Sequence, residues 1–103
     1  MTRTLLSNAR IFDGTGAPIS DGDVVIEDGV ISASMKEVIA LVLAVAAECD
    51  GCIAAHARSA VKRGASPDQV AEALGVAIMM GGGPATVFAP RAWEAYQEFL
   101  GQE

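Results

Sequence analysis

The residues of this chain best suited to chemistry lie between Glu37 and His56. Both cysteines, Cys49 and Cys52, and the single histidine, His56, fall in this stretch. In a helix that begins near Cys49, these three residues occupy positions i, i+3 and i+7 and therefore share one face. The spacing predicts two thiols beside an imidazole base.

This arrangement favours thiol redox chemistry. A helix N-terminus, a neighbouring thiol and a nearby imidazole each favour the thiolate form of a cysteine. Cys52 precedes His56 by one helical turn, so His56 is placed to accept its proton directly or through water. Two residues separate the cysteines and Gly51 adds backbone freedom, so we expect the oxidised form to be a Cys49–Cys52 disulfide.

Each of these residues also has a purely structural interpretation. The cysteines can be small core residues, and a histidine on an apolar helix face is more often part of the core than a catalyst. A capping box that begins at Ser34 accounts for Glu37 as a helix-start residue. A zinc site would need carboxylates or a second subunit to complete four ligands, because the chain has two cysteines and one histidine. We therefore expect neither a metal nor an organic cofactor.

Composition restricts the classes of partner. The chain has 103 residues, 51% of them hydrophobic, which suits one compact domain. Its net charge of −6 argues against a nucleic-acid or anionic-membrane surface. The apolar run from Val38 to Ala47 is too short to cross a bilayer, and the first eight residues lack the apolar segment of a signal peptide. These features predict a cytoplasmic protein whose thiols are reduced at rest.

The first third of the chain has the pattern of β-strands. Residues 4–32 alternate between apolar and polar and are rich in β-branched side chains, which predicts two or three short strands. Asp-Gly pairs are expected to break them at Asp13, Asp21 and Asp28. The pair Asp28-Gly29 favours a tight hairpin between residues 24–27 and 30–32. We expect residues 1–33 to be a β segment rather than an independent domain, with edges that pack on the helices or on another copy.

From Ser34 the apolar period becomes helical. Capping boxes at Ser34 and Ser66 mark two helix starts, the second with proline at the first helical position, and Gly64 is expected to end a helix. Helices are predicted over residues 34–48, 50–62, 67–80 and 84–100. The sequence thus predicts a mainly α fold, with a helical domain over residues 34–103.

The first and last of these helices carry more apolar surface than one core needs. The first is apolar all round, and the last has two apolar stripes. One stripe comprises Phe88, Ala92, Ala95 and Phe99, and the other Trp93, Tyr96 and Leu100. We expect the excess surface to be buried against other subunits, which predicts a homo-oligomer.

Several motifs extend the pattern around the cysteines. They are Lys36-Glu37, Cys49-Asp50-Gly51-Cys52-Ile53-Ala54-Ala55-His56, Arg63-Gly64-Ala65-Ser66, Gln69 to Ala77, Met80-Gly81-Gly82-Gly83-Pro84-Ala85 and Ala89-Pro90-Arg91-Ala92. With them, the segment from about Met35 to Leu100 resembles the AhpD-like alkylhydroperoxidase branch of the carboxymuconolactone decarboxylase family. The resemblance implies a helical bundle assembled into trimers or hexamers, and an antioxidant activity that reduces peroxides or disulfides.

The resemblance also implies a role for each site residue. Cys52 matches the cysteine that attacks the peroxide and becomes a sulfenic acid, and Cys49 matches the one that protonates the leaving oxygen and closes the disulfide. His56 and Glu37 match the histidine and glutamate of the proton relay. Gly51 replaces a further histidine of the best-known members, so the relay is expected to be shorter.

Substrates and partners follow from the same resemblance. The decarboxylase branch lacks the cysteine pair, which argues against lactone decarboxylation. The expected substrate is a hydroperoxide. The expected electron donor is a lipoyl protein, a thioredoxin-like protein or a small thiol.

The N-terminal segment resembles a different family. Residues 5–16 and 22–31 are similar to the opening strands of metal-dependent amidohydrolases. The His-x-His motif and barrel that those enzymes need are absent from the sequence, so no hydrolase activity is implied. Because this segment replaces the helical lead-in of AhpD-like proteins, the alternative hypothesis is a non-catalytic oligomeric assembly module, a fusion or chimera, with a vestigial CxxC site.

Overall fold

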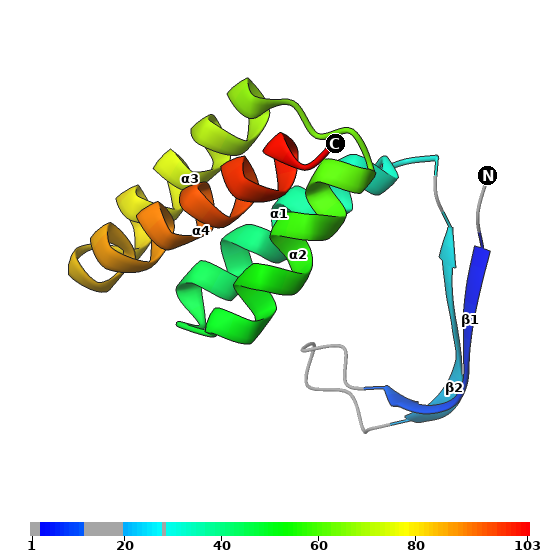
Figure 1. Ribbon diagram of the computed structural model, residues 1–103. Helices are drawn as coiled ribbons and strands as arrows, with labels where there is room; N and C mark the ends of the chain where they lie inside the picture. The colour runs from blue at the N-terminus through cyan, green and yellow to red at the C-terminus, as the bar shows by residue number, and fades with distance from the viewer. Residues whose placement is uncertain (1–2, 12–19, 28) are drawn as a thin grey trace. The chain divides into compact units, whose positions relative to one another are not determined.

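The computed structural model describes residues 3–11, 20–27 and 29–103, and the chain divides into two compact units, Met1–Ser32 and Ala33–Glu103 (Figure 1). The first unit carries the strands β1 (Arg3–Ile11) and β2 (Ser20–Glu27). The second consists of the helices α1 (Ala33–Ala46), α2 (Asp50–Lys62), α3 (Pro67–Gly81) and α4 (Gly83–Gly101). The predicted mainly α fold with a small β element is confirmed, and the predicted helices differ from the observed ones only at their ends.

The strands β1 and β2 form an antiparallel pair. The register joins Arg3 to Glu27 at one end and Ile11 to Ser20 at the other. It shifts between Leu6 and Ala9, where Asn8 has a φ of 56°. Such a shift is typical of a β-bulge, which bends the strand locally.

The predicted strand break at Asp21 and the predicted hairpin at Asp28-Gly29 are wrong. Asp21-Gly22 lies inside β2, where Gly22 pairs with Ala9 beside the bulge. Asp28-Gly29 does not close a hairpin, because β2 ends at Glu27 and residues 29–32 are turn, bend and coil before α1. The partner of β2 is β1, so no strand is needed after Gly29. Asp13-Gly14, the third predicted break, and Asp28 itself lie outside the described residues.

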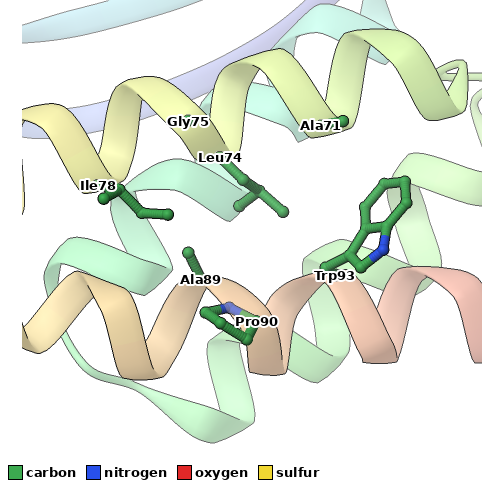
Figure 2. A pocket seen from close by; sticks show the side chains of 7 residues that line it. All are labelled: Ala71, Leu74, Gly75, Ile78, Ala89, Pro90 and Trp93. Atoms are coloured by element: carbon green, nitrogen blue, oxygen red, sulfur yellow. The ribbon is translucent and has the colours of Figure 1, made fainter.

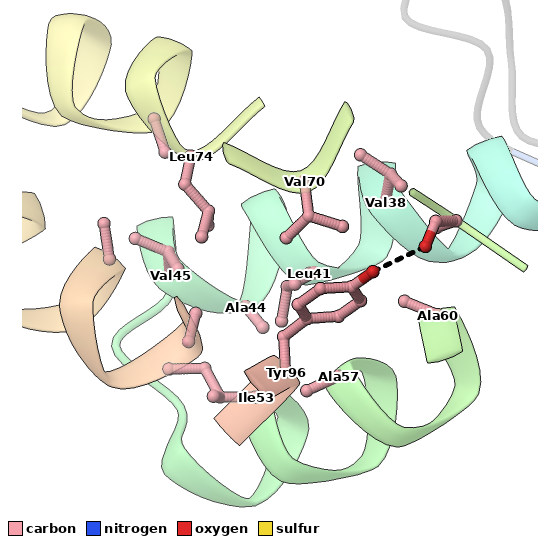
Figure 3. Close-up of a cluster of buried hydrophobic side chains, with 14 of the residues drawn as sticks. Val38, Leu41, Ala44, Val45, Ile53, Ala57, Ala60, Val70, Leu74 and Tyr96 are labelled. Atoms are coloured by element: carbon pink, nitrogen blue, oxygen red, sulfur yellow. Dashed lines mark hydrogen bonds between the residues drawn. The ribbon is translucent and has the colours of Figure 1, made fainter. Parts of the chain in front are cut away.

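The core of the helical unit is built from small and branched apolar side chains of all four helices (Figure 3). Helix α1 packs against the other three helices, and α4 packs against α2 and α3. Tyr96 of α4 is the largest fully buried side chain. Its hydroxyl donates a hydrogen bond of 2.6 Å to the carbonyl of Ala65 (Figure 3). Burial raises the pKa of Tyr96 above its ordinary value of 10.0.

The turn between α2 and α3 has the helix stop and the helix cap that its sequence predicts. The Gly64 N–H donates to Val61 O and the Ala65 N–H to Ala60 O, the two bonds of a Schellman motif. Gly64 occupies the left-handed position with a φ of 81°. Ser66 then caps α3 in a capping box, exchanging bonds of 3.1 and 3.2 Å with Gln69. The predicted helix stop at Gly64 and the predicted capping box at Ser66 are confirmed.

Candidate active site

The turn between α1 and α2 places Cys49 at the start of α2. The Cys49 N–H donates to Ala44 O and the Glu48 N–H to Val45 O, both at 3.1 Å, which again is a Schellman motif. Here the left-handed position, with a φ of 55°, holds Glu48 instead of glycine. For a residue with a Cβ this conformation costs about 1 kcal/mol. The chain therefore reverses sharply into α2 at some local cost.

Cys49 is the N-cap residue of α2. Its backbone is extended, with φ −109° and ψ 99°, and its Sγ accepts a hydrogen bond of 3.2 Å from the Cys52 N–H. The sulfur therefore lies at the positive end of the helix dipole, an environment that favours a thiolate. As the spacing predicts, Cys49 and Cys52 are joined by a disulfide, with their Cα atoms 5.2 Å apart.

Glu37 and His56 meet across α1 and α2. Oε2 of Glu37 lies 2.8 Å from Nδ1 of His56, and the two side chains are 24% and 40% exposed. A carboxylate only accepts hydrogen bonds, so Nδ1 carries the proton in this pair and Nε2 is left as the basic nitrogen. Because α1 begins at Ala33, Ser34 lies inside its first turn rather than before it. The Glu37 carboxylate thus contacts the imidazole, which the helix-cap interpretation does not account for.

A pocket of about 300 Å³ opens beside this pair. Cys52 and His56 line it from α2, and the other walls are apolar: Ala40, Leu43, Ala44 and Ala47. Cys52 is exposed, whereas Cys49 is half-buried. A small molecule in the pocket therefore reaches Cys52, with His56 at its side. The sequence identified the polar residues, but the apolar walls were visible only as a run of buried-helix residues.

Helix α4 contacts the same turn through an ion pair that the sequence did not reveal. Nη1 of Arg91 lies 3.2 Å from Oδ1 and 3.3 Å from Oδ2 of Asp50, which stands between the cysteines. The guanidinium also lies over the Phe88 ring, 4.7 Å from its centre. The two partners are 41 residues apart in sequence, so no local pattern could have paired them.

A second pocket, of about 350 Å³, lies between α3 and α4 (Figure 2). It is lined by Ala71, Leu74, Gly75, Ile78, Ala89, Pro90 and Trp93. None of these side chains is an acid, a base or a nucleophile, so the pocket offers no chemistry. Trp93 also stacks on Tyr96, with ring centres 5.7 Å apart.

The described residues lack two features of other classes of protein, a metal site and a membrane-spanning helix. No group of three or more His, Cys, Asp or Glu residues in the described part of the chain gathers as a metal site would require. No helix in that part is both long and apolar enough to cross a membrane.

Comparison with known proteins identifies the fold family. The model of the carboxymuconolactone decarboxylase family matches residues 20–95, which include all four site residues. The chain belongs to this family. A carboxymuconolactone decarboxylase family protein from Legionella pneumophila, solved as a crystal structure, has the same fold, with a TM-score of 0.70 and 44% sequence identity. The match covers 72% of this chain and 66% of that one.

Two curated relatives of this family member have no assigned activity. An uncharacterized protein from Cupriavidus necator is 42% identical over 66 residues, which are 64% of this chain and 58% of the relative. The uncharacterized protein 4 in the cox locus of Paracoccus denitrificans is 34% identical over 91 residues, 84% of this chain and 82% of the relative. The chain thus spans little more than half the length of the Cupriavidus relative.

Proposed function

We propose that this chain is a thiol-dependent peroxidase or disulfide oxidoreductase of the AhpD-like type. The observation that carries the proposal is the shared pocket of Cys52 and His56, with His56 held by Glu37 at 2.8 Å. Family membership supports a CxxC redox role.

The proposed reaction begins with the reduced protein. The Cys52 thiolate attacks the distal oxygen of a hydroperoxide, the O–O bond breaks, and Cys52 becomes a sulfenic acid. The leaving alkoxide takes the proton of Cys49 and departs as an alcohol. The Cys49 thiolate then attacks Cys52 Sγ, expelling the hydroxyl group, which leaves as water with the proton that Cys52 gave up before the attack. The product is the Cys49–Cys52 disulfide, and a dithiol donor returns two electrons to it.

The proposed proton path uses His56 and Glu37. Nε2 of His56 accepts the Cys52 proton before the attack, because Nδ1 is engaged with Glu37. The Glu37 carboxylate fixes the ring orientation and stabilises the imidazolium that forms, as a buried carboxylate does for other catalytic histidines. The imidazolium then returns this proton to the hydroxyl group that leaves Cys52 as water, so the two thiol protons end in the alcohol and in the water.

The pocket walls support an organic hydroperoxide as substrate. Apart from Cys52 and His56, the lining side chains are alanines and Leu43, which offer apolar contact to an alkyl chain and no hydrogen bond. For the electron donor we propose a lipoyl or thioredoxin-like protein, whose thiol reaches the exposed Cys52. We place the enzyme in the cytoplasm, where such donors keep thiols reduced.

Trapping of the sulfenic acid tests this assignment. In a reduced Cys49→Ser variant, one equivalent of cumene hydroperoxide should convert Cys52 to a sulfenic acid, which dimedone captures and peptide mass spectrometry locates. The Cys52→Ser variant is the matched control and should give no adduct. An adduct on Cys49 in the control, or none in either variant, would contradict the roles assigned to the two thiols.

The exposed apolar side chains of α1 and α3 support the proposed homo-oligomer, a trimer or hexamer. Ile39 and Leu43 of α1 and Val76, Met79 and Met80 of α3 are between 43% and 79% exposed. The same surface favours the second candidate, a non-catalytic assembly module. Light scattering measures the mass of the assembly, and titration of native thiols separates the candidates, since a vestigial, covered site should react only after unfolding.

A further inference from the structure

We propose that Arg91 is a positioning residue for the redox turn, which acts through Asp50 to keep the thiols reactive. The redox turn is the segment from Glu48 to Cys52. The inference rests on the proposed function, because it gives Arg91 a role only if Cys49 and Cys52 cycle between disulfide and thiols.

The contacts of Arg91 tie α4 to this turn from two sides. Its Nη1 reaches both carboxylate oxygens of Asp50, at 3.2 and 3.3 Å, and its guanidinium plane lies 4.7 Å from the centre of the Phe88 ring. Phe88 is itself packed against the core. The stacking restrains the long arginine side chain, so less conformational entropy is lost when it binds the carboxylate.

Asp50 makes this contact important for the thiols. It follows Cys49 directly and is the first residue of α2. A carboxylate favours helix formation at this position, but its negative charge opposes formation of a thiolate nearby. The guanidinium stays protonated over the whole range in which thiols titrate, so it offsets the Asp50 charge at every relevant pH.

The other charged groups around the turn do not supply this compensation. From α1, Glu37 is engaged with His56 of α2. Within the turn, Glu48 is exposed and negative. On α4, Glu94 follows Arg91 by one turn and is also exposed and negative. Arg91 thus supplies a permanent positive charge that Glu37, Glu48 and Glu94 do not.

Stability alone does not explain the ion pair. The Arg91 side chain is 50% exposed and that of Asp50 is 68% exposed. Exposed pairs of this kind contribute little to folding because water and salt screen them. The same charges still act on a thiol in the same turn, since a unit charge about 6 Å away in water shifts a titration midpoint by about half a pH unit.

The test measures how fast the reduced full-length protein is alkylated as a function of pH. Iodoacetamide is the probe, and peptide mass spectrometry reports Cys49 and Cys52 separately. In Arg91→Gln the midpoint of the pH profile should rise by about half a pH unit, most at Cys49, and the shift should shrink in 1 M salt. Asp50→Asn should lower the midpoint, and the double variant Asp50→Asn/Arg91→Gln should return close to wild type.

Arg63→Gln is the matched control, because it removes the same charge at the opposite end of α2, about 20 Å away. Its midpoint should equal that of wild type. Equal midpoints in Arg91→Gln and Arg63→Gln would overturn the proposal, whether both stay or both move. A double variant that keeps the Arg91→Gln shift would also overturn it, because Arg91 would then not act through Asp50.

This measurement is independent of peroxide turnover. If wild-type protein reduces neither hydroperoxides nor disulfides but the Arg91 and Asp50 midpoints shift as expected, the proposed function is wrong and the effect of Arg91 on the thiols stands. If turnover depends on Cys52 but the midpoints do not shift, only the role of Arg91 is wrong.

Discussion

The turn that carries the cysteines and the turn between α2 and α3 are built on the same backbone pattern with different residues. Both end a helix with the two hydrogen bonds of a Schellman motif, and the next helix starts two residues after Glu48 in one turn and three residues after Gly64 in the other. In the second turn, Gly64 takes the left-handed position and Ser66 the N-cap. In the redox turn the same positions hold Glu48 and Cys49.

The residue differences between the two turns separate what folding requires from what the proposed chemistry requires. Gly64 and Ser66 are residues that this pattern favours. Glu48 and Cys49 are poorer choices, because a Cβ is strained in the left-handed region and sulfur is a weak hydrogen-bond acceptor. The redox turn gives up local stability to hold a thiol at a helix N-terminus.

Helix α4 contacts both turns, through a buried side chain in one and through a half-exposed side chain in the other. Tyr96 is fully buried and donates to the Ala65 carbonyl beside Gly64. Arg91 is half-exposed and binds the Asp50 side chain beside Cys49. The first contact satisfies a buried polar group, whereas the second leaves the redox turn open to solvent and to substrate.

Replacement of Tyr96 by Phe should have the largest effect on stability. It leaves the Ala65 carbonyl without its donor in a buried setting, which costs about 1 to 3 kcal/mol. Arg91→Gln is the contrasting variant and should cost less than about 1 kcal/mol, because its ion pair is exposed. Denaturant unfolding of the reduced proteins measures both. Equal losses of unfolding free energy in the two variants would contradict the expected difference between a buried hydrogen bond and an exposed ion pair.

Ionisation of Tyr96 should also make the free energy of unfolding depend on pH. Burial raises the folded-state pKa of Tyr96 above 10.0, so the unfolded chain loses the phenolic proton first. The stabilisation is present below about pH 10 and is lost as the pH rises through the folded-state value. Unfolding midpoints of wild type should therefore fall above pH 10, and those of Tyr96→Phe should fall less. Parallel curves for the two proteins would rule out this origin.

Substitutions at the two left-handed positions, Gly64 and Glu48, should change the stability of the protein by smaller amounts and in opposite directions. Gly64→Ala should destabilise the protein by about 1 kcal/mol, since an added Cβ finds open space but a strained backbone. Glu48→Gly should stabilise the reduced protein by up to about 0.5 kcal/mol, because relief of strain exceeds the entropy that glycine adds to the unfolded chain. Thermal unfolding compares the pair. A loss of stability in Glu48→Gly would mean that the glutamate makes contacts that outweigh its strain.

Local signals predicted most of the fold. Ser66, Pro67 and Gly64 act within one turn of the chain, so their positions in the sequence specify a helix end and a helix start without tertiary information. The hairpin at Asp28-Gly29 was predicted wrongly because a turn signal does not reveal which strands it joins. The partner of β2 is β1, an earlier segment of the chain, and no local sequence pattern around Asp28 specifies that partner.

The site was predictable to the same degree. Cys49, Cys52 and His56 lie within two turns of one helix, so their sequence spacing alone places them on the same helix face. The role of Glu37 could be predicted only from the resemblance to a family, because its partner is 19 residues away on another helix. The apolar pocket walls and the Asp50–Arg91 pair depend on how α1, α2 and α4 pack, which the sequence pattern does not determine.

Consumption of cumene hydroperoxide by the reduced protein, with dihydrolipoamide as electron donor, tests directly whether Cys52 is a peroxidase nucleophile. The wild-type protein should turn over repeatedly, and the Cys52→Ser variant should fall to the rate of the donor alone. A wild-type rate equal to that of Cys52→Ser, in protein whose native thiols both react with a thiol reagent, would rule out the proposed peroxidase activity and favour an assembly module.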